Sequence, residues 1–144
     1  MENCNLDFVN EVYRNVSVAL LSINDVTDSV ADSELKNELR SEYEKYQEFS
    51  NDIKDFMREK GYEIKDVSKM KKFMMWSAIK MNTAMDDSKS HVAEIMIKGT
   101  VMGITELNKI LNDSASVNDE KAKDFAKRLL SLQEEFEENL KRFL

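Results

Sequence analysis

The chain has 144 residues, a formal net charge of −7, 42% hydrophobic and 34% charged residues, no proline and three glycines. This balance is typical of one globular domain over residues 1–144, which can bury a sizeable core without disulfides or metals. The scarcity of helix breakers favours long helices and excludes a mainly β fold, and the negative charge speaks against nonspecific binding to nucleic acid.

The location of the protein follows from its cysteine and its apolar runs. Cys4 is the only cysteine, so neither an intramolecular disulfide nor a thiolate cluster can form. The first residues lack the basic start and apolar stretch of a signal peptide. Apolar runs such as Phe73–Trp76 are too short to span a bilayer. We therefore expect a cytoplasmic protein without a membrane partner.

The first two predicted helices each carry one apolar stripe with the alternating spacing of three and four that indicates a core-facing helix. The first stripe consists of Val9, Val12, Val16, Ala19, Ile23, Val26 and Val30. A turn over residues 28–33 follows, with Asp32 or Ser33 as the N-cap of the next helix. That helix runs to Lys60 and directs inward Leu35, Leu39, Tyr43, Tyr46, Phe49, Ile53 and Phe56. Gly61 is its predicted stop.

Three more helices are predicted in the second half of the chain. One begins after Asp66 and ends near Met85, and its apolar residues cover more than one face. The next is capped by Ser88 or Ser90 and carries on one face Ala93, Ile97, Val101, Ile104 and Leu111. After a turn over residues 112–117, Asn118 caps the last helix, which directs inward Ala122, Phe125, Leu129, Leu132, Phe136, Leu140 and Phe143.

Four long amphipathic helices with an extra segment between the second and third resemble the ferritin-like plan. The stretch His91–Ile104, together with the closing segment Leu132–Leu144, is similar to small ferritin-like proteins of bacteria. The resemblance implies an all-α, up-down four-helix bundle with an additional crossover helix between the second and third bundle helices.

Ferritin-like di-iron sites take a Glu from each of two helices and a Glu-x-x-His from each of the other two. This chain has one histidine, His91, and the residue three positions before it is Ser88. We therefore expect no di-iron site and no cofactor. The reversed pair His91 and Glu94 could still ligate a single metal ion, helped by Asp86 or Asp87, but its plainer interpretation is a helix start beside a surface Glu.

Two further features allow alternative interpretations. Glu42 falls on the apolar stripe of the second helix, either as a vestigial metal ligand or ligand-binding acid, or at the edge of the stripe where it reaches water while Tyr43 fills the core. We expect the second arrangement. The thioethers of Met70, Met74 and Met81 could bind heme or copper, although methionines at such spacing are more often core or interface residues.

Gly99 and Gly103 lie on one face in a helix interior, where each costs about 1 kcal/mol relative to alanine. We expect another backbone to approach them closely; a cofactor ring is the rarer alternative. The broad apolar surface of the predicted helix over residues 66–85 predicts a homodimer. Its predicted interface consists of Met70, Phe73, Met74, Trp76, Met81, Gly99 and Gly103.

No motif for catalysis is present, because a Ser-His-Asp arrangement is possible only through His91, no nucleophile-elbow or oxyanion glycine motif accompanies any serine, and three glycines cannot build a phosphate-binding loop. The predicted function is therefore non-catalytic association with a second copy or a partner. An atypical metal or cofactor site, at His91 and Glu94 or on the methionine-rich helix, is the alternative.

Overall fold

The computed structural model describes residues 2–65 and 88–144 of the chain, and within these ranges it contains four helices and no strand. The helices are α1 (Glu2–Thr27), α2 (Ser33–Glu59), α4 (Lys89–Asn112) and α5 (Glu120–Lys141). This confirms the all-α prediction. The predicted helix over residues 66–85 lies outside the described residues, as do Met70, Phe73, Met74, Trp76 and Met81.

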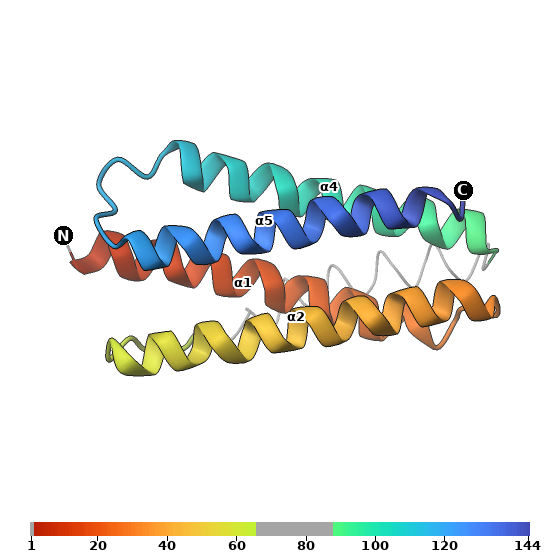
Figure 1. Ribbon diagram of the computed structural model, residues 1–144, viewed down its shortest axis with the longest axis horizontal. Helices are drawn as coiled ribbons and strands as arrows, with labels where there is room; N and C mark the ends of the chain where they lie inside the picture. The colour runs from red at the N-terminus through yellow and green to blue at the C-terminus, as the bar shows by residue number, and fades with distance from the viewer. Residues whose placement is uncertain (1, 66–87) are drawn as a thin grey trace.

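The four helices form a bundle whose helix directions are defined by contacts between helix ends (Figure 1). At one end, Lys89 at the start of α4 pairs with Asp32, the N-cap of α2, at 3.9 Å. At the other end, Asn5 of α1 donates a hydrogen bond to Asn118, just before α5, at 2.8 Å. Therefore α1 and α5 run in one direction, and α2 and α4 in the other. The end of α2 and the start of α4 lie at opposite ends of the bundle.

The cross-section of the bundle is a rhombus. Both α1 and α5 pack against each of the other described helices, whereas α2 and α4 hardly touch. The predicted stripe of α1 is confirmed, since all its members are buried except Ala19, which is partly buried against the core. None of the helices in the described part of the chain has the length and apolar character needed to cross a membrane.

Both ends of α2 are built as the sequence predicts. Asp32 accepts a hydrogen bond from the backbone N–H of Leu35 at 2.9 Å and so satisfies one of the free donors of the first turn. At the other end Gly61 has a φ of +72°, the left-handed conformation that favours glycine. The N–H of Tyr62 then bonds the carbonyl of Met57 at 2.8 Å and that of Gly61 bonds the carbonyl of Arg58 at 3.0 Å. This pair of bonds is a Schellman motif, which ends the helix.

The predicted core face of α4 is only partly correct, and the predicted N-cap of α5 is wrong by one residue. Ala93 is buried, and Ile97 and Leu111 are partly buried against the core, but Val101 is 41% exposed. The buried residues of α4 are Val92, Ala93, Met96, Thr100 and Leu107. Thr100 and Gly103 occupy inward positions of α4. The spacing of apolar residues in the sequence therefore does not identify this face as the buried one. The N-cap of α5 is Asp119 rather than Asn118, and its carboxylate accepts from the N–H groups of Lys121 and Ala122 at 3.0 and 3.2 Å.

Four ion pairs join α2 to α5 along the edge where these helices run antiparallel. The pairs are Glu38–Arg142 at 3.5 Å, Lys45–Glu135 at 3.5 Å, Asp52–Arg128 at 2.9 Å and Lys60–Asp119 at 3.4 Å. The sign of the α2 partner alternates from pair to pair, and the α2 partners are spaced seven, seven and eight residues apart. We call this set the ion-pair ladder. A shift by one heptad would place Glu38 opposite Glu135 and Lys45 opposite Arg128, so the ladder disfavours the wrong register.

We expect the ladder to contribute through charge complementarity rather than through individually strong bonds, because most of its side chains are half-exposed. Asp52→Arg places two guanidinium groups together and should lower the free energy of unfolding by about 1 kcal/mol at low salt. Adding Arg128→Asp should restore most of that loss, as measured by urea denaturation. The control is Glu48→Arg, which makes the same charge change at an exposed position of α2 outside the ladder. Strict additivity of the Asp52 and Arg128 changes would contradict a coupled pair.

Candidate functional site

The most unusual side chain of the core is the carboxyl group of Glu42, and here the sequence-based expectation is wrong. Glu42 is 1% exposed and lies in line with Leu39 and Tyr46, whereas Tyr43 is only partly buried. The 3.6-residue helical repeat places position 42 between these two inward positions, so Glu42 rather than Tyr43 occupies the core. A carboxylate buried in this way must be paired or protonated.

The surroundings of Glu42 provide little to stabilise a negative charge. Its Oε1 atom has no hydrogen-bond partner among the described residues, and the same is true of the adjacent Tyr46 hydroxyl. Its Oε2 atom lies 4.0 Å from the ammonium group of Lys45. Burial raises the pKa of Glu42 to about 7, with Glu38 and Glu135 adding to the rise and Lys45 and, more weakly, the Tyr46 hydroxyl opposing it. Burial also raises the pKa of Tyr46 well above its ordinary value, so that phenol stays protonated.

The raised pKa couples the ionisation of Glu42 to folding. In the unfolded chain the carboxyl has its ordinary pKa of 4.5, so between pH 4.5 and about 7 the folded protein holds a proton that the unfolded chain has lost. The contribution of Glu42 to stability is therefore fully present below pH 4.5 and is lost as the pH rises through 7. At 1.36 kcal/mol for each pKa unit, this loss amounts to roughly 3 kcal/mol.

A second polar group crosses the centre of the bundle and joins α1, α4 and α5. The Gln133 side-chain amide donates to Asn15 Oδ1 at 2.6 Å, and the Asn15 amide donates to the backbone carbonyl of Gly103 at 3.1 Å. Gln133 is 2% exposed and Asn15 is 8% exposed. We call these three residues the amide cluster. Sequence reasoning missed it, although Gln133 stands on the apolar stripe between Leu129 and Phe136, which is a detectable signal.

The structure gives Gly99 and Gly103 different surroundings. A Cβ at position 103 would lie 2.9 Å from Oε1 and 3.1 Å from Nε2 of Gln133, so the close neighbour is a side-chain amide rather than the expected second backbone. At Gly99 none of the described residues comes within 4 Å of the Cβ position, and this glycine is exposed. The expected role of both glycines in an interface between copies stays a prediction.

His91 and Glu94 lie one turn apart near the start of α4, as predicted. The distance between His91 Nδ1 and Glu94 Oε2 is 3.9 Å, and the other carboxylate oxygen of Glu94 pairs with Lys98 at 3.0 Å. The backbone N–H of His91 bonds the N-cap Ser88 at 3.3 Å. Within residues 2–65 and 88–144, no three His, Cys, Asp or Glu side chains are grouped so that they could hold a metal ion. Asp86 and Asp87, the other proposed ligands, lie outside these ranges.

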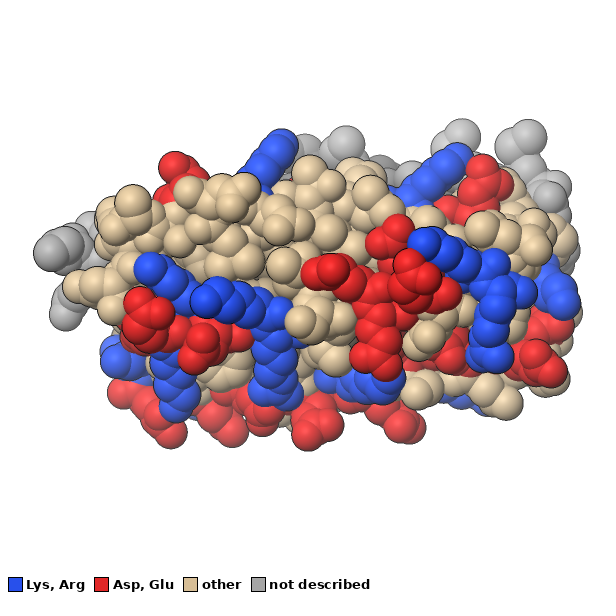
Figure 2. Space-filling model, turned by 45° about the horizontal axis from the view of Figure 1, so that its top comes forward, with Lys and Arg blue, Asp and Glu red and all other residues tan. Residues whose placement is uncertain are grey.

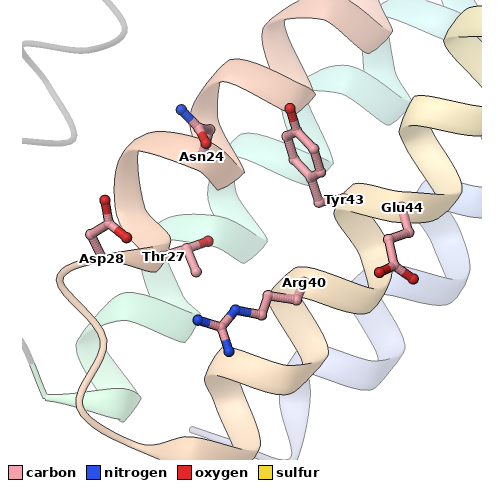
Figure 3. Close-up of a pocket in the computed structure, with 6 residues that line it drawn as sticks. All are labelled: Asn24, Thr27, Asp28, Arg40, Tyr43 and Glu44. Carbon is pink, nitrogen blue, oxygen red and sulfur yellow. The ribbon is translucent and has the colours of Figure 1, made fainter.

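A shallow pocket of about 280 Å³ lies between the end of α1 and the first half of α2 (Figure 3). Its lining residues are Asn24, Thr27, Asp28, Arg40, Tyr43 and Glu44. Arg40 extends from α2 toward Thr27, whereas Glu44 points away from it (Figure 3). This lining includes neither a histidine nor a cysteine, and the Thr27 hydroxyl donates a hydrogen bond to the carbonyl of Ile23 at 2.5 Å. The pocket is an open polar depression rather than an enclosed site.

The outer face of α4 carries few charges. Helix α4 has five charged residues in 24, close to the five in 26 of α1 and well below the thirteen in 27 of α2 and the eleven in 22 of α5. In Figure 2, which turns the α4 side toward the viewer, a broad uncharged area lies beside a band of acidic and basic side chains. Met102 is 63% exposed and Val101 is 41% exposed on this helix. We call the surface formed by Lys98, Gly99, Val101, Met102 and Glu106 the α4 patch.

Comparisons with known proteins give no further assignment. No protein-family model matches the chain, and neither the curated proteins nor the solved structures include a significant match.

The two glycines of α4 provide a matched test of the amide cluster. Gly99→Ala adds a methyl group in open space and should stabilise the fold by about 1 kcal/mol, because alanine is the better helix former. Gly103→Ala forces the buried Gln133 amide aside and should instead destabilise the fold by about 1–3 kcal/mol. Chemical denaturation at submicromolar protein concentration measures both. Equal stabilisation by the two substitutions would show that the amide cluster adapts without loss.

Proposed function

We propose that the chain is a non-catalytic, ferritin-like helical bundle that acts by self-association, and that the α4 patch is the surface that contacts a second copy. The observation that carries this proposal is the exposure of Met102 and Val101 on α4, a helix with far fewer charges per residue than α2 or α5. An exposed methionine one helical turn from an exposed glycine is a composition suited to contact with another helix.

The order of charges around Met102 favours a second copy over an unrelated partner. Lys98 stands four residues before Met102 and Glu106 four residues after it, so all three project from the same side of α4. If two α4 helices crossed antiparallel about a two-fold axis at Met102, Lys98 of each copy would face Glu106 of the other. Both residues are exposed, and Glu106 has no ion-pair partner in the described part of the chain.

The topology of the bundle supports the ferritin-like part of the proposal. Two antiparallel hairpins, α1–α2 and α4–α5, are joined by a connection whose ends lie at opposite ends of the bundle. One such long connection distinguishes ferritin-like bundles from bundles with short loops throughout. Since a single helix offers a small contact area, we expect the dimer to be weak and concentration-dependent.

Charge reversal at the α4 patch tests the proposed dimer. Lys98→Glu alone and Glu106→Lys alone each place like charges across the two-fold axis and should weaken association about tenfold or more. The double variant restores opposite charges and should recover association. Sedimentation velocity from micromolar to submillimolar concentration measures the change from the chain mass of 16.7 kDa to twice that value.

Two controls separate the patch from general charge effects. Lys127→Glu makes the same charge change at an exposed position of α5 and should leave association unchanged. Circular dichroism confirms that each variant keeps its helices. A wild-type mass of 16.7 kDa at every concentration would rule the proposal out. Failure of the double variant to recover association would exclude the proposed two-fold axis.

A further inference from the structure

The carboxyl group of Glu42 lies at the contact between α2 and α5, between two steps of the ion-pair ladder. Glu38 and Lys45, the α2 partners of these two steps, stand one helical turn before and after it along α2. On the α5 side, the ring of Tyr46 packs edge-on against Phe136, with centroids 6.1 Å apart and an interplanar angle of 88°. Glu42 is therefore held in an apolar layer with an ion pair on either side of it.

Lys45 links Glu42 to the ladder. Its ammonium nitrogen is 3.5 Å from Glu135 Oε1 and 4.0 Å from Glu42 Oε2, and neither distance is that of a tight charge-assisted hydrogen bond. Its side chain is 40% exposed, which leaves the ammonium group free to move between the two carboxylates. When Glu42 is protonated, Lys45 pairs with its ladder partner Glu135. Ionised Glu42 competes with Glu135 for the same cation.

We propose that Glu42 is a proton-binding site that controls how tightly α2 and α5 are held together. With the proton bound, the carboxyl is neutral, tolerates burial, and leaves the Lys45–Glu135 pair in place. When the proton dissociates to water, a carboxylate remains in the core with Oε1 unpartnered, and the low-cost responses are to draw Lys45 inward or to admit water. Both responses loosen the contact between α2 and α5 around position 42.

The charged groups that face Glu42 place this transition near neutral pH. On α2 these are Lys45 and Glu38, with the Tyr46 phenol beside them, and on α5 they are Glu135 and, through its pair with Glu38, Arg142. Helix α1, which also packs against α2, contributes no charged group to this set. Burial and the two acids favour the proton, and Lys45 opposes it, which together bring the pKa to about 7.

Hydrogen exchange of the full-length chain tests the proposal at the level of the individual helices. If opening restores an ordinary carboxyl pKa, the opening equilibrium around position 42 should increase about tenfold between pH 6 and pH 8. Exchange rates, corrected for their intrinsic pH dependence, should show this increase in the middle of α2 and in the second half of α5. The Glu42→Gln variant should lose it, and Glu48→Gln, at an exposed position on α2, should retain it.

Two further variants keep the test decisive if Glu42→Gln does not fold, because both alter side chains at the surface. Lys45→Met removes the cation that favours ionisation and should move the midpoint of the transition to higher pH. Glu135→Gln removes an acid and frees Lys45, and it should move the midpoint to lower pH. An unchanged pH response in Glu42→Gln, or midpoints that ignore both neighbouring substitutions, would overturn the proposal. The outcome does not depend on association through the α4 patch.

Discussion

The antiparallel contact between α2 and α5 is the constraint on which the rest of the structure depends. These helices belong to different hairpins, and their contact, together with those of α1 with α4 and α5, positions the α1–α2 hairpin against the α4–α5 hairpin. Apolar packing alone tolerates a shift by one heptad, since both stripes repeat with that period. The ion-pair ladder removes this ambiguity, because its alternating signs turn a shifted register into a set of like-charge contacts.

Two polar features of the core differ in the number of hydrogen bonds that they make, although Gln133 Oε1, like Glu42 Oε1, has no partner among the described residues. The amide cluster of Asn15, Gln133 and Gly103 pairs one donor on each amide with an acceptor, and it ties three helices together at one level of the bundle. Such buried polar contacts specify which neighbours meet, at some cost in stability. Glu42 has no comparable partner. Its burial lowers the stability of the fold above neutral pH. An apolar residue would fit this position better, and proteins keep such unfavourable residues mainly at functional sites.

The surface of the bundle divides according to charge density. The exposed sides of α2 and α5 are dense in charge, which supports the ladder, whereas α4 leaves methionine, valine and glycine exposed. One chain thus combines a highly charged seam, which sets its own fold, with a sparsely charged helix face available to a second molecule. The seam and this face belong to different helices, so a change in one need not disturb the other.

The sequence by itself determined the four described helices and most of their ends. Spacing of three and four predicted the stripe of α1, and local chemistry predicted Asp32 and Gly61 as caps, because these signals depend only on residues a few positions apart. Tertiary structure decided the rest. Glu42 and Gln133 are buried because the neighbouring apolar residues carry them inward, and the core line of α4 runs through Thr100 and Gly103, which hydrophobicity cannot mark. Which charges pair also depends on the antiparallel alignment of α2 with α5, and no local pattern in either helix contains that alignment.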